Sequence, residues 1–279
     1  MKDFGYLLVV NGENSVYYDM ANLLALSIKR TQPSGYDNVC IVSEKSETYN
    51  RFVYDKFIVK TNQEKGWDQR NLMFDISPYK HTICLDSDMY FTKDISHWVD
   101  HFINDSYGLY INKNVTKYNG DEMTNLHCRP TYKENKLPLL YSGFTYFNKE
   151  SAIANDFFDL VKAITYNKEL FRNRYLTKGF PPEMGTDEVF SLAAKLLNIE
   201  EKISYDMSFP KFAHLKYMLQ DVDISSIAKD LGIYFNDTVD VTIGNHRQYD
   251  IIHYSDKEFP LNEMTKVYRE LMFKGIKHG

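Results

Sequence analysis

Two aspartates separated by one residue follow a short apolar run in the first third of the chain. Residues 81–85 have the composition of a buried strand, and Asp86, Ser87 and Asp88 come directly after it. In open α/β sheets, ligands bind beyond the carboxyl ends of the strands. Two carboxylates that converge there repel each other unless a cation lies between them. Because Mg²⁺ and Mn²⁺ prefer oxygen ligands and bridge to phosphates, the spacing indicates a metal site for phosphate chemistry.

The same three residues also fit a solvated turn or a helix cap. The predicted strands and helices around them help to choose between these interpretations and a metal site. The first hundred residues alternate between short apolar runs and helical patterns. We expect strands at 6–10, 38–43, 57–59 and 81–85, and helices at 15–30 and 69–76. This alternation predicts an α/β fold with a mixed, mainly parallel central sheet that is flanked by helices on both faces.

The rest of the chain is less regular. We expect strands at 107–111 and 143–147, helices at 150–166 and 187–197, an apolar run at 249–254 and a helix at 261–273. Residues 112–138 contain two prolines and many Asn, Lys and Thr, which indicates a long loop that is functional or mobile. No Ser/Gly-rich linker or internal repeat divides the chain, so we interpret 1–279 as a single domain.

Composition narrows the classes of protein. The net charge of −5 gives no general attraction to nucleic acid or to an anionic membrane. Three cysteines without a CxxC spacing argue against a disulfide framework or a structural zinc site. No signal peptide or transmembrane segment is evident in the sequence, so we expect a cytoplasmic protein. The phosphate-binding glycine loops and the Gly-x-Ser-x-Gly motif are also missing from the sequence.

Residues 77–88 carry a resemblance to a known family. This segment begins with Ser-Pro-Tyr, continues with four residues and one hydrophobic residue, and ends with Leu-Asp-Ser-Asp. The pattern resembles the DxD region of nucleotide-sugar glycosyltransferases with the GT-A fold, in particular the glycogenin-like family eight. Arg70 on the preceding helix and Asp94 soon after the acids also match this family. The resemblance extends over most of residues 4–100. It implies a Rossmann-like GT-A domain, with residues 1–111 as the donor half and 112–279 as the acceptor half.

Three short segments later in the chain also resemble this family. Tyr141-Ser142-Gly143 resembles the strand beside the donor sugar, although Tyr141 stands where the family has Asn. Asp187 opens a helix at the position where the family places an acid that faces sugar and acceptor. His253, followed by an aromatic residue, matches the C-terminal histidine that supplies a third metal ligand. Lys257 matches a lysine that contacts the diphosphate, with a shorter spacing from the histidine than is usual.

The resemblance implies a complete set of site residues. Mn²⁺ or Mg²⁺ is expected on Asp86, Asp88 and His253, and Asp187 and Arg70 are expected at the reacting centre. The residues expected to bind the nucleotide sugar are Val10, Asn11, Tyr17, Arg70, Asp86, Ser87, Ser142, Gly143 and Lys257.

These residues predict a metal-dependent hexosyl- or pentosyltransferase, of the retaining type, that takes a sugar from a UDP-sugar. Its acceptor is unknown: a glycan, a protein, or modified bases in DNA. Two other classes stay open, namely a sugar-phosphate nucleotidyltransferase and a non-catalytic sugar- or nucleic-acid-binding protein. Between residues 162 and 178, five basic residues against one acidic residue give a local charge of +4, interleaved with aromatic residues. This stretch allows a nucleic-acid or phosphorylated acceptor, or is simply the solvated face of a helix. No obligate protein partner is indicated.

Overall fold

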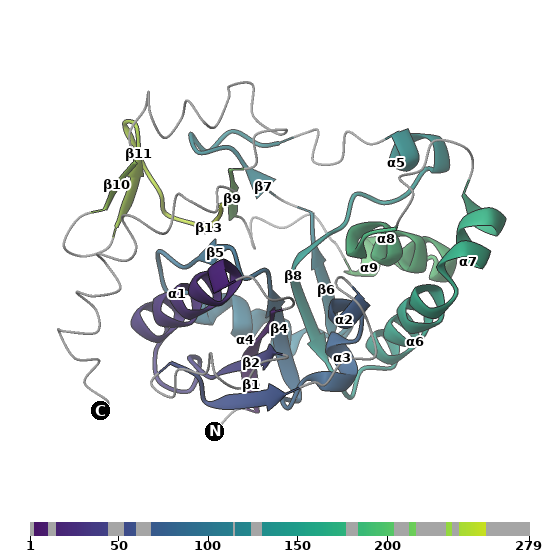
Figure 1. The fold of residues 1–279 in the computed structure, drawn as a ribbon, viewed down its shortest axis with the longest axis horizontal. Coiled ribbons are helices and arrows are strands. Elements are labelled where there is room, and N and C mark those ends of the chain that lie inside the picture. The colour runs from purple at the N-terminus through teal and green to yellow at the C-terminus, as the bar shows by residue number, and fades with distance from the viewer. Residues whose placement is uncertain are drawn as a thin grey trace.

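The computed structural model describes residues 3–10, 15–43, 53–59, 68–113, 115–123, 130–176, 184–203, 212–215, 233–235 and 240–254. Its centre is a six-stranded sheet with the order β3-β2-β1-β4-β8-β6 (Figure 1). These strands are β1 (Phe4–Val10), β2 (Val39–Ser43), β3 (Lys56–Val59), β4 (His81–Leu85), β6 (Leu109–Asn112) and β8 (Tyr141–Asn148).

The direction of the strands confirms the mixed, mainly parallel sheet. Strands β3, β2, β1 and β4 run parallel to one another, and β8 runs antiparallel to both β4 and β6. The carboxyl ends of β1, β2 and β4 therefore lie at one edge. All six strands lie where the sequence predicts them, with ends that differ by one or two residues.

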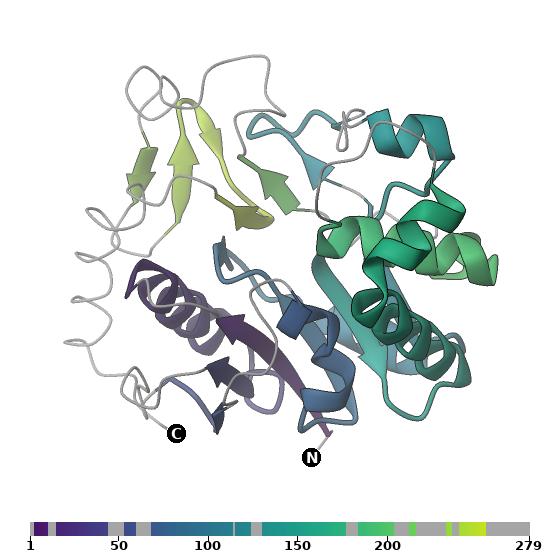
Figure 2. The same cartoon turned by 45° about the vertical axis from the view of Figure 1, so that its right-hand side comes forward.

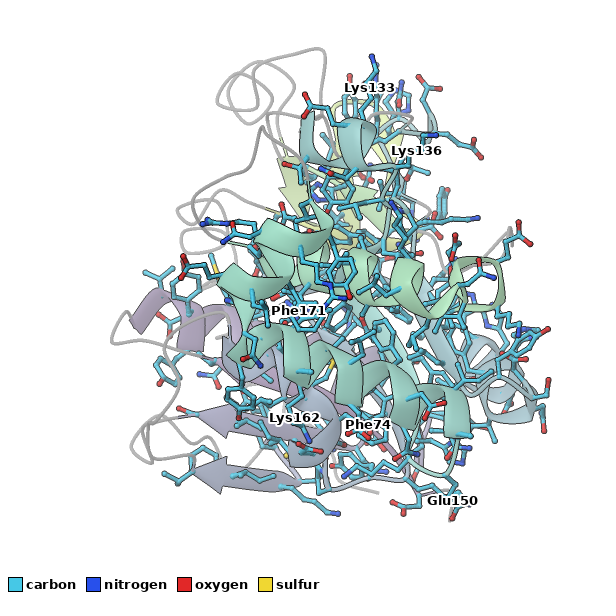
Figure 3. The ribbon with its side chains drawn as sticks, turned by 90° about the vertical axis from the view of Figure 1, so that its right-hand side faces the viewer. Phe74, Lys133, Lys136, Glu150, Lys162 and Phe171 are labelled. Carbon is cyan, nitrogen blue, oxygen red and sulfur yellow. The ribbon has the colours of Figure 1, made fainter. Side chains whose placement is uncertain are left out.

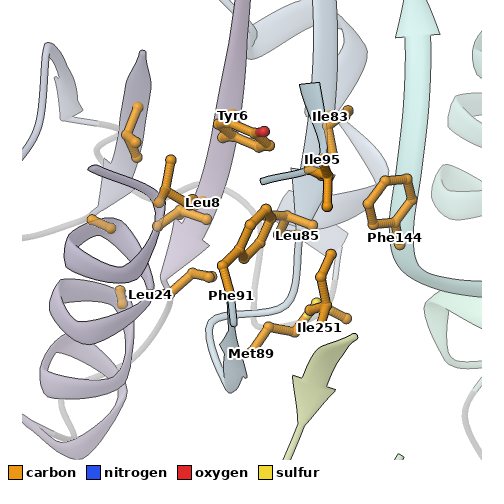
Figure 4. Packing of buried hydrophobic residues seen from close by; sticks show 14 of the residues in the cluster. Tyr6, Leu8, Leu24, Ile83, Leu85, Met89, Phe91, Ile95, Phe144 and Ile251 are labelled. Carbon is orange, nitrogen blue, oxygen red and sulfur yellow. The ribbon is translucent and has the colours of Figure 1, made fainter. Parts of the chain in front are cut away.

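Alternate residues of each strand face opposite sides of the sheet, and each side is covered by helices. On β4, Ile83 and Leu85 belong to one apolar cluster, whereas Cys84 belongs to the other. The first cluster includes residues of α1 (Ser15–Thr31) and α4 (Ser96–Asn104), and Figure 4 shows part of it around Tyr6 and Phe91. The second includes residues of α6 (Ala152–Tyr166) and α8 (Thr186–Leu197). Because β4 is buried on both faces, its Ile83, Cys84 and Leu85 form an apolar run with no alternation of polar residues.

Two smaller sheets lie beside the central one (Figure 2). One has four strands in the order β5-β13-β9-β7, and the other has three in the order β10-β11-β12. Their bounds are β5 (Met89–Tyr90), β7 (Val115–Thr116), β9 (Phe212–His214), β10 (Ile233–Phe235), β11 (Val241–Ile243), β12 (His246–Arg247) and β13 (Ile251–His253). Residues of β5, β11 and β13 pack with Met20 and Leu23 of α1 in a third apolar cluster.

Some elements differ from the sequence prediction. The predicted helix at 69–76 is two short helices, α2 (Asp68–Asn71) and α3 (Met73–Ile76). The segment 112–138, predicted as a loop, contains β7 and α5 (Pro130–Asn135). Helices α4 and α9 (Glu200–Ile203) were not predicted, whereas α7 (Lys168–Tyr175) lies in the basic stretch, for which a solvated helix face is one of the interpretations. The predicted helix at 261–273 lies outside the described residues. Within the described part of the chain, no helix combines the length and apolarity needed to cross a membrane.

Candidate metal centre

The three predicted metal ligands lie together at the carboxyl end of β4. Asp86, Asp88 and His253 each offer one ligand atom, and these atoms all lie within 4.8 Å of one another. The backbone explains the meeting. The turn Asp86-Ser87-Asp88 leads directly into β5, and β13 pairs antiparallel with β5 so that His253 lies opposite Met89. The amide of Tyr254 also donates to the carbonyl oxygen of Asp88, at 3.0 Å.

Each ligand carboxylate has a donor partner in this structure. Nε2 of His253 lies 2.8 Å from Oδ1 of Asp88 and 3.8 Å from Oδ2 of Asp86. Nη1 of Arg70 forms an ion pair with Asp86. The imidazole and the guanidinium thus offset the repulsion between the two carboxylates. Two carboxylate oxygens and one imidazole nitrogen also make a donor set that fits Mn²⁺, so the residues present fit the predicted metal.

Strand β8 contributes a bulge that carries two further predicted residues. Its register against β6 shifts between Ile111 and Asn112, so β8 carries extra residues between Tyr141 and Thr145. Bulges of this kind re-aim backbone groups and are common beside active sites. Here the carbonyl oxygen of Ser142 accepts from Nη2 of Arg70 at 2.7 Å. Gly143 accepts from the amide of Asp86 at 3.0 Å.

Asp187 joins the same group of residues from the other side. It lies in the first turn of α8, and its Oδ1 accepts from the amide of Ser142 at 2.9 Å and from the Ser142 hydroxyl at 2.7 Å. Two hydrogen bonds to one oxygen fix the orientation of the carboxylate. The structure therefore connects Asp187, Ser142, Arg70 and Asp86 in one chain of polar contacts that ends at the candidate metal centre.

Of the remaining residues predicted to bind the nucleotide sugar, the structure describes Val10, Tyr17 and Ser87. The side chain of Val10 is buried in the core at the end of β1, so only its backbone is left to meet a ligand. Tyr17 is half-buried on α1, and its neighbour Tyr18 is buried and accepts a hydrogen bond from Ser43 at 2.8 Å. Ser87 is half-buried in the turn between the two acids. Asn11 and Lys257 lie outside the described residues.

Two other sequence features have structural roles in the described part of the chain. Oδ1 of Asp94 accepts from the amide of Ser96 at 2.7 Å, at the start of α4. In the basic stretch, Lys162 pairs with Asp75 at 2.6 Å, and Figure 3 shows Lys162 and Phe171 on the helical side of the molecule. Helix α7 has no buried residue, and Arg174 lies over the Tyr175 ring at 5.4 Å. This matches the predicted solvated helix face.

Sequence reasoning did not predict the residues behind His253. The Tyr141 hydroxyl lies 2.6 Å from Nδ1 of His253 and 3.2 Å from Nε2 of His214. A signal for His214 exists in the sequence: Phe-Ala-His-Leu at 212–215 repeats the pattern of Ile-Ile-His-Tyr at 251–254, an apolar pair, a histidine and an apolar residue. The two segments form β9 and β13, which pair in parallel with His214 opposite His253.

The comparisons with known proteins agree with this architecture. No protein-family model matches the chain, and no curated protein sequence matches it. Among solved structures, the fold is similar to that of mouse xyloside xylosyltransferase 1 in its apo form, with a TM-score of 0.51 and 13% sequence identity. The match covers 91% of this chain and 98% of the mouse chain. At this identity the likeness concerns the fold alone: the chain has a mixed α/β, GT-A-like fold with an Asp-x-Asp and histidine cluster.

Proposed function

We propose that this protein is a metal-dependent glycosyltransferase that takes a sugar from a UDP-sugar. The observation that carries the proposal is the meeting of Asp86, Asp88 and His253 within 4.8 Å at the carboxyl end of the central sheet. The GT-A-like fold, which the mouse xylosyltransferase shares, supports it. The cluster supports the metal dependence and does not identify the sugar or the acceptor. The retaining outcome, the UDP donor and the division into a donor half at 1–111 and an acceptor half at 112–279 rest on the resemblance of the sequence motifs.

The proposed chemistry follows from the charge that develops on a nucleotide diphosphate as the bond to the sugar breaks. A divalent ion held by the two aspartates and the histidine stabilises that charge. Arg70, which contacts Asp86 and the Ser142 carbonyl, supplies a second positive charge beside the same position. Asp187, oriented by Ser142, faces the sugar as its binder or as a base. Asn11, Tyr17 and the Val10 backbone hold the base, and Lys257 contacts the diphosphate.

The first experiment is hydrolysis of a panel of nucleotide sugars, because transferases often release donor to water and no acceptor need be known. The wild type, in Mn²⁺ and in EDTA, is compared with Asp88→Asn. We expect Mn²⁺-dependent release of UDP from one donor, reduced on the order of 100-fold in the variant. Asp159→Asn is the matched control, since the Asp159 side chain is 81% exposed on α6. It should keep wild-type turnover.

Further arms of the same experiment separate the other classes. Pyrophosphate release from UTP and a sugar phosphate would indicate a nucleotidyltransferase instead. If no donor is hydrolysed, and calorimetry with Mn²⁺ detects no binding of UDP or UDP-sugars, the proposal fails and a binding protein is favoured. An acceptor made of DNA would show salt-sensitive binding that is lost when Arg172 and Arg174 are changed to Glu.

A further inference from the structure

A chain of three buried polar rings lies behind the candidate metal centre. His253 and His214 are fully buried and Tyr141 is only 5% exposed. The Tyr141 hydroxyl lies between the two histidines, 2.6 Å from Nδ1 of His253 and 3.2 Å from Nε2 of His214. Burying polar groups is costly unless they are hydrogen-bonded. These contacts satisfy the ring nitrogen of His253 that points away from Asp88.

The fold holds the three rings rigidly. The parallel pairing of β13 with β9 places His253 beside His214, with ring centroids 4.6 Å apart. Tyr141, at the start of β8, packs against both, with centroids at 5.7 Å from His253 and 5.2 Å from His214. Phe212 closes the group at 5.4 Å from Tyr141. The His253 ring therefore has little freedom to rotate.

The directions of the hydrogen bonds follow from the contact with Asp88. A carboxylate only accepts, so Nε2 of His253 carries a proton and donates to Asp88 at 2.8 Å. In the neutral ring, Nδ1 then accepts from the Tyr141 hydroxyl, and that hydroxyl accepts from Nε2 of His214. A tyrosine hydroxyl can donate one hydrogen bond and accept another, so the Tyr141 hydroxyl fits between the two rings.

A histidine that ligates a metal through Nε2 needs the opposite arrangement. Its proton must be on Nδ1, donated to the Tyr141 oxygen, and the Tyr141 hydroxyl must donate to an unprotonated Nε2 of His214. The proton lost from Nε2 of His253 is balanced by one gained at Nδ1 of His214. The two hydrogen bonds of the Tyr141 hydroxyl are therefore made in both arrangements, each with donor and acceptor exchanged.

We propose that Tyr141 and His214 are positioning residues that orient His253 and, by reversing their hydrogen bonds, let it change from donating to Asp88 to ligating the metal. This inference rests on the metal centre of the proposed function. It assigns a role to the tyrosine that stands where the resembling family has Asn, and to a histidine outside the ligand set.

The test is Mn²⁺ titration of the full chain by calorimetry, which needs no substrate. Partners of metal-bound histidines typically contribute 10–100-fold to metal affinity. We expect Tyr141→Phe and His214→Leu to weaken Mn²⁺ binding by about that factor. His214→Gln should lose less, because an amide still donates and accepts. Tyr6→Phe is the matched control: Tyr6 is fully buried on β1, and its hydroxyl has no hydrogen-bond partner among the residues that the structure describes.

A second readout reports the proton position directly. Long-range ¹⁵N–¹H spectra of the histidine rings distinguish the two neutral forms. Adding diamagnetic Mg²⁺ to the wild type should move the His253 proton from Nε2 to Nδ1, and Tyr141→Phe should abolish this shift at matched Mg²⁺. Thermal unfolding of each variant without metal verifies that it is folded.

The outcomes separate the inference from the proposed function. If the wild type binds Mn²⁺ and Tyr141→Phe binds it within about twofold, well short of the expected loss, the inference is overturned while the metal centre stands. Equal losses in Tyr6→Phe and Tyr141→Phe would also overturn it, because the effect would then be general. If the wild type binds neither Mn²⁺ nor Mg²⁺, the metal centre and the inference fail together.

Discussion

Gly143 lies where several side chains of the candidate site crowd together. A Cβ atom at this position would lie 2.3 Å from Cε1 of Tyr141 and 2.9 Å from Oδ2 of Asp86. Neither neighbour has room to withdraw easily, since Tyr141 is held by two histidines and Asp86 by Arg70. The absence of a side chain at Gly143 is therefore a steric requirement of this arrangement of Tyr141 and Asp86 at the candidate metal centre.

Gly143→Ala should consequently reduce both stability and metal affinity. Overpacking typically costs about 1–3 kcal/mol of unfolding free energy, and here it displaces Tyr141 or Asp86. The measurements are urea unfolding and Mn²⁺ calorimetry. Gly5→Ala is the control, because its Cβ would meet the Tyr79 ring at 2.3 Å, at the amino end of β1. We expect it to lose stability while keeping Mn²⁺ affinity; a Gly143→Ala protein with unchanged Mn²⁺ affinity would contradict the crowding argument.

Arg70 should have opposite effects on metal binding and on turnover. It pairs with Asp86 and donates to the Ser142 carbonyl. Arg70→Gln removes a positive charge beside the cation, so Mn²⁺ affinity should rise. Release of UDP should fall on the order of 100-fold, because the developing phosphate charge loses a partner. Lys80→Gln, which removes the same charge from a residue paired with Glu150, should change neither quantity. If Arg70→Gln lowered both Mn²⁺ affinity and UDP release, the main role of Arg70 would be to stabilise the fold.

At the scale of elements, β4 carries different chemistry at its two ends. Its carboxyl end leads to the acids, whereas His81 begins it, with Nδ1 2.9 Å from the Tyr146 hydroxyl. Burial, aided by the charge of Lys80, lowers the pKa of His81 from its ordinary 6.5. The folded protein thus favours neutral His81, and the unfolded chain takes up the proton first as pH falls. This stabilisation is complete above about pH 6.5 and is lost as pH falls below it.

The unfolding free energy should therefore decrease between pH 7 and pH 5.5 with a contribution from His81. Urea unfolding at a series of pH values measures the slope. His81→Gln has no titrating group there, so its slope over this range should be smaller than that of the wild type, whatever its stability at pH 7. Identical slopes in the two proteins would show that His81 titrates alike in both states.

Helix α8, which carries Asp187, ends at a residue in the left-handed conformation. Asn198 has φ 54° and ψ 49°, and its amide donates to the carbonyls of Ala194 and Lys195. A left-handed residue with a Cβ is strained, although Asn tolerates it better than most residues and Gly tolerates it fully. Asn198→Ala should cost about 1 kcal/mol of unfolding free energy, and Asn198→Gly should cost none. Urea unfolding measures the three proteins, and an Asn198→Ala variant as stable as the wild type and Asn198→Gly would contradict this explanation of the helix end.

The sequence predicted best those elements that have strong local patterns. Strand β1 and the end of β4 at Ile83, Cys84 and Leu85 are apolar runs, and α1 shows its apolar face over many turns. Helix α4 was missed because nine residues with only Trp98, Val99 and Phe102 buried give a short pattern. Strands β5, β9 and β13 have two or three residues each, and their existence depends on pairing with distant segments. No local pattern specifies such pairs.

The site divides in the same way. Asp86 and Asp88 follow from one strand and its turn, whereas the place of His253 rests on motif resemblance until β13 is seen to pair with β5. The contact between Asp187 and Ser142 and the role of His214 depend on how β8, α8 and β9 assemble. Tyr141 appeared in the sequence only as a departure from a motif, since a hydrogen bond across 112 residues leaves no local signal.

At the scale of the whole molecule, the candidate metal centre joins segments that are distant in the chain. The hydrogen bond between His253 and Asp88 spans 165 residues. Through β13 it also connects β9 and β7, and the third apolar cluster packs Ile252 of β13 with Met20 and Leu23 of α1. A metal ion bound there would be held only by the folded protein, because the ligands separate on unfolding. Its binding free energy therefore adds to the stability of the fold.

The melting temperature of the wild type should consequently rise with Mn²⁺ concentration. At a free concentration 100 times the Kd, the expected stabilisation is about 2.7 kcal/mol, and EDTA should reverse it. Differential scanning calorimetry across a Mn²⁺ series measures the rise. Asp88→Asn and His253→Asn should give flat series, whereas Asp159→Asn, exposed on α6, should follow the wild type. If Asp88 ligates the bound ion, replacing it should remove the stabilisation by Mn²⁺. An equal rise of the melting temperature in Asp88→Asn would therefore mean that Mn²⁺ binds the folded protein at another site.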